Sequence, residues 1–255
     1  MITHTERPLS VVIPAYNEEK TVEQVVRKVL EVNLVGEVIV VNDCSRDKTS
    51  EIVQAIQREE PRLKLVEHEI NQGKGAALRT GFKEATLSYV IVQDADLEYD
   101  PEEFPLVLEP LIAGKCDVCY GSRYLKKHQR RVLKFWHTRG NRFLTTLSNF
   151  ATHLYLTDME TCYKAFKREV IQRSNIEENR FGFEPEVTAK IAQRHIPVYE
   201  VSISYYPRSF AEGKHIGWKD GFRAIWCILK YGILRRNKSH VVESDQESKS
   251  LQPEA

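Results

Sequence analysis

Short runs of β-branched and aliphatic residues alternate with helix-forming segments through the first half of the chain, and this alternation constrains the fold more than any other feature. Four apolar runs are typical of buried parallel strands: LSVVIP at 9–14, EVIVVN at 37–42, LKLVEH at 63–68 and YVIVQ at 89–93. Segments with helical spacing separate them, at 21–31, 49–59 and 74–85. Because such units form right-handed crossovers, the sequence predicts an α/β fold with a doubly wound, mostly parallel sheet.

The second half of the chain is less regular. CDVCYGS at 116–122 predicts another strand, and further elements are expected as a helix at 185–194, a strand at 197–206 and an amphipathic, aromatic and basic helix at 218–236. The predicted organisation is an N-terminal extension at 1–8, one folded domain at 9–236 and a polar, disordered tail at 237–255.

Composition excludes several classes of protein. A net charge of +1 gives no global attraction to nucleic acid, so we expect no nucleic-acid partner. No leader-like or membrane-spanning apolar stretch is apparent, which predicts a cytosolic protein. The five cysteines are expected to be reduced. Cys116 and Cys119 form a CxxC, but within a predicted strand and without a second such pair they are interpreted as packed thiols rather than a zinc or redox site.

Carboxylates follow three of the predicted strands, in PAYNEE, NDCSRDKT and QDADLEY. Parallel strands end at the same edge of a sheet, where α/β proteins bind ligands. Ordinary helix capping by Ser45, Asp47 and Thr49 would explain the second turn. It does not explain Asp94, Asp96 and Glu98, which would share one side of an extended chain. Three carboxylates in that pattern predict a site for Mg²⁺ or Mn²⁺.

The segment NQGKGAALRTGF at 71–82 has two glycines around Lys74 but lacks the spacing of a Walker motif. Its glycines would let the backbone approach an anionic ligand at a helix N-terminus, and a plain turn explains them equally well.

Taken in order, VVIPAYNEEKTV, VIVVNDCSRDKTSEIV, NQGKGAALRTGF, VIVQDADLEYDP, VCYGSRY, RGNRFLTTLSN, DMETCYKAFKREVI and FGFEPEV resemble family 2 glycosyltransferases. Within that family the resemblance is to the dolichyl- and polyprenyl-phosphate hexose synthases, and it covers about residues 9–236. It implies a GT-A fold, a nucleotide-sugar donor and a divalent metal.

The resemblance also implies roles for individual residues. Asp94 and Asp96 match the DxD pair, with Asp96 as the direct metal ligand and Glu98 as a second one. Arg123 and Arg139 match arginines that hold a lipid phosphate. The remaining matches are to residues that bind the donor, with Asp43 at the nucleoside and the last two on a loop that closes over the pyrophosphate: Pro14, Ala15, Tyr16, Glu18, Asp43, Arg208 and Lys214.

The sequence departs from the family pattern in places. NDCS replaces the commoner DDGS, so Asn42 and Cys44 leave the choice between UDP- and GDP-sugars open. The QxxRW motif and membrane spans of processive synthases are absent from the sequence, which argues against polymer synthesis.

The expected function is transfer of one hexose, with inversion, from a nucleotide sugar to a polyprenyl or dolichyl phosphate. A lipid phosphate is already anionic and needs no general base, whereas a hydroxyl on a soluble, glycan or protein acceptor is the alternative. Two other classes fit less well. A sugar nucleotidyltransferase would have a glycine-rich loop in place of PAYNEE, and a non-catalytic binding module would have no use for the cluster of carboxylates.

Residues 126–142 contain seven lysines or arginines and two histidines, and 124–157 contain no acidic residue. Together with the aromatic helix at 218–236, this tract predicts peripheral attachment to the cytoplasmic face of an anionic membrane. A membrane-anchored partner subunit is the alternative route to a lipid substrate.

Overall fold

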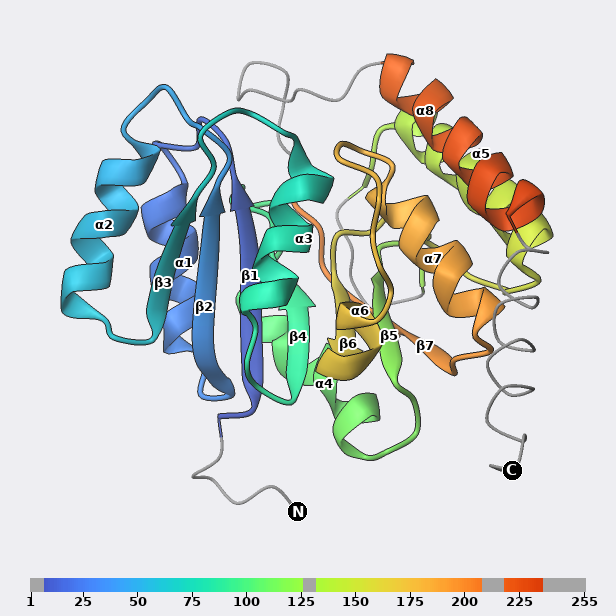
Figure 1. The fold of residues 1–255 in the computed structure, drawn as a ribbon. Helices are drawn as coiled ribbons and strands as arrows, with labels where there is room; N and C mark the ends of the chain where they lie inside the picture. The colour runs from blue at the N-terminus through green and yellow to red at the C-terminus, as the bar shows by residue number, and fades with distance from the viewer. Residues whose placement is uncertain (1–6, 126–131, 208–217, 236–255) are drawn as a thin grey trace, which may run out of the picture.

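A seven-stranded sheet runs through the protein in the order β3-β2-β1-β4-β6-β5-β7 (Figure 1). The computed structural model describes residues 7–125, 132–207 and 218–235. The strands are β1 Leu9–Ala15, β2 Val35–Asn42, β3 Leu63–Glu67, β4 Tyr89–Val92, β5 Val118–Ser122, β6 Lys164–Lys167 and β7 Val198–Ser202. The α-helices are α1 Val22–Glu31, α2 Thr49–Glu59, α3 Lys74–Glu84, α4 Phe104–Ile112, α5 Phe135–Thr152, α6 Arg168–Gln172, α7 Phe183–Gln193 and α8 Trp218–Leu229. A 3₁₀ turn, η1 Pro101–Glu103, precedes α4, and a π-helix, η3 Lys230–Leu234, continues α8.

The sheet is mostly parallel, as predicted. β1 lies between β2 and β4 and pairs in parallel with both, so that Val12 lies opposite Ile39 on one side and Val92 on the other. The exception is β6, which is antiparallel to β4 and to β5 and was not predicted. Its four residues, KAFK, carry two lysines and lack the apolar run that marks the other strands.

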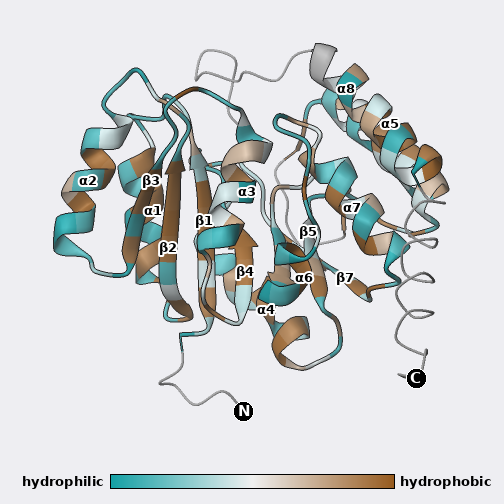
Figure 2. Ribbon diagram, in the orientation of Figure 1, coloured by the Kyte–Doolittle hydropathy of each residue, from teal (hydrophilic) through white to brown (hydrophobic). Residues whose placement is uncertain are grey.

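Helices cover both faces of the sheet and bury the strands between them. α3 packs on β1 and β2, while α4 packs on β5, β6 and β7, and Figure 1 shows these two helices on opposite faces. The apolar residues concentrate in the strands, as Figure 2 shows. Val11, Val12, Val40 and Ile91 are completely buried. This two-sided burial is why the strands have uninterrupted apolar sequences rather than an alternating pattern.

The first-half helices lie where the sequence predicts them to within one residue, and most differences concern where elements end. The strand expected at 197–206 ends at Ser202, and the helix expected at 218–236 changes to a π-helix after Leu229. Cys119 lies within β5 and Cys116 just before it; both are buried free thiols, which confirms the packed-thiol interpretation.

Helix α5 was not predicted from the sequence. Its fully buried residues are the small Thr145, Ser148 and Ala151, and Leu144 and Leu147 beside them are partly buried against the core. α5 lies beside α8, and both contact α7 at the end of the molecule away from α2 (Figure 1). None of the helices in the described part of the chain has the length and apolar character that a bilayer crossing requires.

Two helical glycines give a test of the packing between α3 and the sheet. A Cβ at Gly81 would lie 2.3 Å from Cγ1 of Val12, whereas a Cβ at Gly140 in α5 would meet nothing within 4 Å. Gly81→Ala should therefore lower the free energy of unfolding by about 1–3 kcal/mol through overpacking. Gly140→Ala should raise it by about 0.5–1 kcal/mol, because alanine restricts the unfolded chain. Urea unfolding of both variants measures this; a stabilising Gly81→Ala would contradict the close packing.

Candidate functional site

A pocket of about 520 Å³ opens at the carboxyl ends of β1, β2 and β4. The loops that follow parallel strands all lie at this edge of the sheet. β1 is central here, because β2 and β3 lie on one side of it and β4 lies on the other. The pocket brings together nine residues that the sequence predicted as a site: Pro14, Ala15, Tyr16, Glu18, Asp43, Lys74, Asp94, Asp96 and Glu98.

The turns after β1 and β2 hold each other through side chains. The Asn17 N–H donates to Oγ of Ser45 at 2.9 Å, and the Glu18 N–H donates to Oγ1 of Thr49 at 2.9 Å. Asp47 accepts from the backbone N–H of Thr49 at 3.0 Å, as a capping residue would. Asp47 thus satisfies an N–H at the start of α2, although the N-cap position itself is Lys48, whereas Ser45 and Thr49 fix the neighbouring turn, whose residues line the pocket.

Asp43 organises the segment that leads into α3. Its Oδ1 accepts from the backbone N–H of Gln72 at 2.9 Å and lies 2.7 Å from Nδ1 of His68, while its Oδ2 accepts from the N–H of Gly73 at 2.6 Å. The other ring nitrogen of His68 lies 2.9 Å from Oγ1 of Thr80. Asp43 is thus buried and immobilised at the pocket wall. His68 was missed by sequence reasoning, because an isolated histidine in a strand carries no signal.

The two glycines around Lys74 allow close approach of the protein's own backbone. A Cβ at Gly75 would lie 2.2 Å from the carbonyl oxygen of Glu178, and one at Gly73 would lie 2.5 Å from that of Asn179. Gly73 also has a φ of 100°, a conformation that favours glycine. Neither of the two interpretations given to this segment included this long-range contact.

Lys74 lies at the first position of α3 and is partly buried between two carboxylates. Its Nζ is 2.8 Å from Oδ1 of Asp94 and 3.3 Å from Oε1 of Glu184. Burial opposes the charged form, but the two carboxylates outweigh it and raise the pKa of Lys74 well above its ordinary value. Lys74 therefore stays protonated and holds Asp94, the first carboxylate of the DxD pair, in an ion pair.

Asp94, Asp96 and Glu98 all line the pocket, but not for the reason given from sequence. β4 ends at Val92 and the chain bends from Ala95 onward, so the three do not alternate along a strand. Instead the turn brings them together, and the N–H of Glu98 donates to Oδ1 of Asp96 at 3.3 Å. The hydroxyl of Tyr205 donates to Oε2 of Glu98 at 2.6 Å and fixes that side chain.

The donor set of this turn suits a hard divalent cation. Within the described residues no group of three or more histidine, cysteine or acidic side chains is arranged as a complete metal cage. Mg²⁺ and related ions are commonly held by one or two carboxylates, with substrate phosphates completing the shell. Asp96 and Glu98 at the pocket wall fit that arrangement, since Asp94 is paired with Lys74.

The two arginines predicted to hold a lipid phosphate are in different surroundings. Arg123 is buried and binds Asp158 in a bidentate pair, with Nε–Oδ2 and Nη2–Oδ1 distances of 2.7 Å. Its guanidinium lies 5.0 Å from the ring centre of Tyr205, which in turn holds Glu98. Arg139 is exposed on α5. Neither lines the pocket at the strand ends, so their role with a phosphate stays a prediction.

Arg208 and Lys214 lie outside the described residues.

The pocket also contains residues that sequence reasoning did not select, among them Asn71, Arg180 and Phe181. Arg180 and Phe181 belong to the segment before α7, more than eighty residues after the DxD pair, and no pattern in the sequence connects the two.

Outside the pocket, one carboxyl group of the second half of the chain has a buried oxygen without a partner. Oε1 of Glu160 is buried with no hydrogen-bond partner, and burial together with the charge of Glu184 raises the pKa of Glu160 to about 7. Nearby, Nζ of Lys164 donates to the carbonyl of Met159 at 2.8 Å, and burial lowers the pKa of Lys164 to about 8. Both groups belong to DMETCYK at 158–164, which matches the family pattern but was not predicted to contain a site.

Comparison with known proteins identifies the class. The model of glycosyl transferase family 2 matches residues 10–174, and the chain belongs to this family. It is 29% identical over 229 residues to the dolichol-phosphate mannosyltransferase of Pyrococcus furiosus, covering 88% of this chain and 64% of that one. It is 27% identical over 239 residues to the polyprenol monophosphomannose synthase of Mycolicibacterium smegmatis, covering 91% and 89%.

A solved structure agrees with the fold. Glucosyl-3-phosphoglycerate synthase from Mycobacterium tuberculosis, in complex with Mn²⁺, UDP and phosphoglyceric acid, superposes with a TM-score of 0.69 at 20% identity, over 89% of this chain and 79% of that one. The predicted GT-A fold is thereby confirmed, and the family match confirms the predicted membership of glycosyl transferase family 2.

The buried carboxyl group of Glu160 gives a pH-dependent test of stability. Its pKa is raised on folding, so the folded state binds more protons than the unfolded state between the ordinary value of 4.5 and about 7, and stability is lost as pH rises through that window. Glu160→Gln removes this loss. The Tm of Glu160→Gln minus that of the wild type should therefore be larger at pH 8 than at pH 4.5, measured by thermal unfolding. A difference that does not change with pH would contradict the burial of this group.

Proposed function

We propose that the protein transfers one hexose from a UDP- or GDP-linked sugar to a polyprenyl or dolichyl phosphate, with inversion at the anomeric carbon. The observation that carries the proposal is the pocket at the strand ends, which gathers Asp43, Lys74, Asp94, Asp96 and Glu98. The names of the two relatives, a dolichol-phosphate mannosyltransferase and a polyprenol monophosphomannose synthase, support the acceptor class.

The donor side of the reaction follows from the pocket. Asp43 is held rigidly by backbone N–H groups and presents a fixed acceptor to the nucleoside, and Tyr16 offers an aromatic face at the pocket wall. Asp96 and Glu98 would hold Mg²⁺ or Mn²⁺ beside the diphosphate. Such an ion, when bound, neutralises the charge that develops on the departing pyrophosphate. Lys74 keeps Asp94 in place, and Tyr205 keeps Glu98 in place.

The acceptor side needs positioning rather than activation. A phosphate monoester is largely dianionic at neutral pH and attacks the anomeric carbon without losing a proton to the enzyme. Arg139, exposed on α5, is free to orient it, with Arg208 and Lys214 at the leaving group as the resemblance implies. Arg123 is committed to Asp158 and would act through its fixed charge.

The alternative, transfer to a hydroxyl of a soluble, glycan or protein acceptor, has one observation in its favour. A hydroxyl nucleophile needs a general base, and Glu160 is a buried carboxyl group with an unpartnered oxygen and a pKa of about 7. Its charged neighbours are Glu184, Lys164, Arg123 and Asp158, and Glu160 itself does not line the pocket at the strand ends.

The transfer reaction itself separates these proposals. Radiolabelled UDP-glucose, UDP-N-acetylglucosamine and GDP-mannose are incubated with the protein, with and without polyprenyl or dolichyl phosphate. Label should appear in the lipid fraction from one of these donors. EDTA should abolish this labelling by removing the metal ion, and Asp96→Ala should abolish it by removing a ligand of the ion. Asp96→Ala should leave the Tm nearly unchanged, since a carboxylate at the pocket wall adds little to stability.

Glu160→Gln is the matched control for the acceptor. It should retain lipid labelling, because a phosphate needs no base. Label on a soluble or protein acceptor that disappears in Glu160→Gln would contradict the lipid proposal and support the hydroxyl alternative.

A membrane-facing surface would bring the enzyme to its lipid. On α5, Phe135, Trp136, Phe143 and Phe150 are exposed, and Trp136 is 82% exposed. On the adjacent α8, Phe222 and Trp226 are exposed as well. Aromatic side chains favour the headgroup region, so we propose peripheral attachment through α5 and α8 on the cytoplasmic face.

Vesicle binding tests the attachment. The basic residues Lys126, Lys127, Arg130 and Arg131 lie outside the described residues, and each is expected to contribute about 1 kcal/mol near an anionic surface. Cosedimentation with anionic vesicles should be strong at low salt and fall steeply as salt rises, because charges are screened. Replacing the four residues by glutamine should weaken vesicle binding without changing nucleotide binding. Equal binding to neutral vesicles would contradict electrostatic attachment and favour a membrane-anchored partner subunit.

A further inference from the structure

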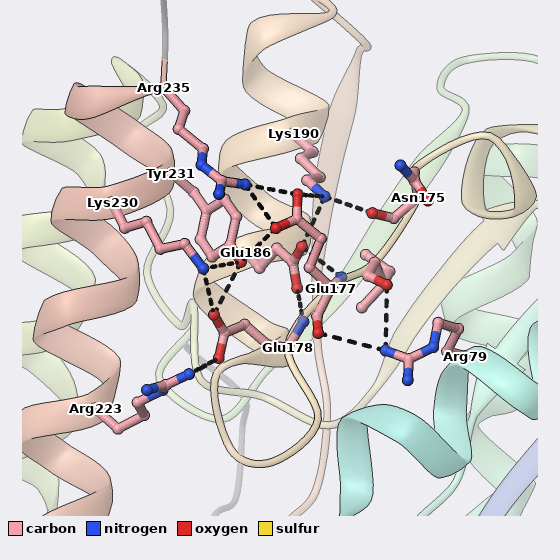
Figure 3. Close-up of polar contacts among 11 residues, drawn as sticks. Arg79, Asn175, Glu177, Glu178, Glu186, Lys190, Arg223, Lys230, Tyr231 and Arg235 are labelled. Carbon is pink, nitrogen blue, oxygen red and sulfur yellow. Dashed lines mark hydrogen bonds and ion pairs between the residues drawn. The ribbon is translucent and has the colours of Figure 1, made fainter.

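Besides packing on α5 and α7, the C-terminal helical segment, α8 with its π-helical extension η3, directs three side chains to one buried carboxylate (Figure 3). Glu178, 3% exposed, accepts from Arg223 Nε at 3.1 Å, Lys230 Nζ at 3.0 Å and the Tyr231 hydroxyl at 2.9 Å. Burial opposes ionisation, but these three donors outweigh it and lower the pKa of Glu178 to about 2. We call Glu178, Arg223, Lys230 and Tyr231 the Glu178 cluster.

The geometry of η3 contributes to this convergence. A π-helix carries an extra residue per turn, and such segments occur often at functional sites. Lys230 and Tyr231 are the first two residues of η3, and both reach Glu178. Arg223 reaches the same carboxylate from α8, so the change of helical pitch falls between the groups that meet there.

The backbone next to Glu178 is fixed from the opposite side. Glu186, completely buried in α7, accepts from the N–H groups of Glu177 and Glu178 with both oxygens at 2.8 Å, and Lys190 lies 2.7 Å from it. Glu177 in turn pairs with Arg235 at the end of η3, at 2.6 Å. Residues 176–181, which we call the wall segment, are therefore held between α7 and the C-terminal helix (Figure 3).

The other side of the wall segment packs against the start of α3. The N–H of Ala76 donates to the carbonyl of Asn179 at 3.1 Å, and Arg79 donates to Oδ1 of Asn179 at 2.9 Å. The carbonyl of Glu178 occupies the space that a Cβ at Gly75 would fill. No side chain separates the two backbones here, so a shift of the wall segment would be transmitted directly to the first turn of α3.

The wall segment ends in the donor pocket. Arg180 and Phe181 line the pocket beside Gly73 and Lys74. Cγ of Arg180 lies 2.8 Å from the position of a Cβ at Gly73. Glu178 is thus only two residues before Arg180, which lines the pocket. None of the described residues of α8 lines the pocket itself.

From this arrangement we infer that Glu178 is a positioning residue for the donor pocket, and that the α8–η3 segment completes the pocket by holding the wall segment through it. The inference rests on the proposed function to the extent that the pocket binds a nucleoside diphosphate. It also gives the C-terminal helical segment a second function. This segment exposes Phe222, Trp226, Ile233 and Leu234. Contact of these side chains with a lipid surface would hold the segment in place and would thereby also fix the pocket wall.

Nucleotide binding to the full-length protein tests the inference. UDP and GDP, each with Mn²⁺, are titrated by calorimetry well below the Tm into the wild type, Glu178→Gln, Arg223→Gln and Arg223→Lys. For whichever nucleotide the wild type binds, the Kd should rise about tenfold in Glu178→Gln and Arg223→Gln, within the range of coupling between distant sites. Arg223→Lys should recover much of the affinity, and KM for the donor should rise more than kcat falls.

Lys115→Gln is the matched control. It removes one positive charge and the ion pair with Glu109, at the opposite end of the sheet from the pocket, and should leave Kd unchanged. A merely structural role for the cluster would lower the Tm of Glu178→Gln and Arg223→Gln without changing Kd, and that result would overturn the inference alone. Failure of the wild type to bind either nucleotide would overturn the proposed function and the inference together.

Hydrogen exchange gives a readout that does not depend on ligand. In Arg223→Gln, the amides of residues 73–77 and 177–182 should exchange faster than in the wild type, while those of β1 and β2 should not change. Unaltered exchange in both segments would contradict the transmission of the Glu178 cluster to the pocket. Anionic vesicles should tighten nucleotide binding in the wild type and do so less in Arg223→Gln.

Discussion

The site depends on the compensation of negative charge at the carboxyl edge of the sheet. Acidic side chains from several loops converge there, and isolated carboxylates would be costly to bury. Each has a specific partner: backbone N–H groups and His68 for Asp43, Lys74 for Asp94, and the hydroxyl of Tyr205 for Glu98. These partners fix the carboxylates before any ligand binds, which is the condition for effective electrostatic stabilisation of a transition state.

The ion pairs of Lys74 give the carboxylates of the pocket different roles. Because Lys74 lies between Asp94 and Glu184, the first carboxylate of the DxD pair is tied to the start of α3, and Asp96 and Glu98 are the pair better placed for a cation. Glu184 belongs to α7 and lies just after the wall segment, so the same ion-pair group connects the pocket floor with the second half of the fold. The pocket is consequently shared between both halves of the chain.

The second half of the fold differs in character from the first. Where the first half repeats strand and helix with apolar interfaces, the layer of α5, α7 and α8 is joined by buried ionic groups such as Glu178 and Glu186. Buried ion pairs add little net stability compared with apolar packing but are demanding in geometry. This suits a segment whose inner side fixes a pocket wall and whose outer side exposes aromatic residues.

The sequence by itself determined the parallel sheet, the helices of the first half, the family and most of the residues that line the pocket at the strand ends. Those features depend on local patterns: apolar runs such as LSVVIP mark buried strands, and parallel strands necessarily deliver Asp43, Asp94 and Asp96 to one edge. Only the tertiary structure decided the remainder. β6 lacks an apolar run, α5 buries mainly small residues, the carboxylates meet through a bend rather than a strand, and Gly75 serves a backbone contact with Glu178 about a hundred residues away. Contacts at such separation, and the partners that each buried charge selects, depend on how the elements pack, and no local pattern encodes them.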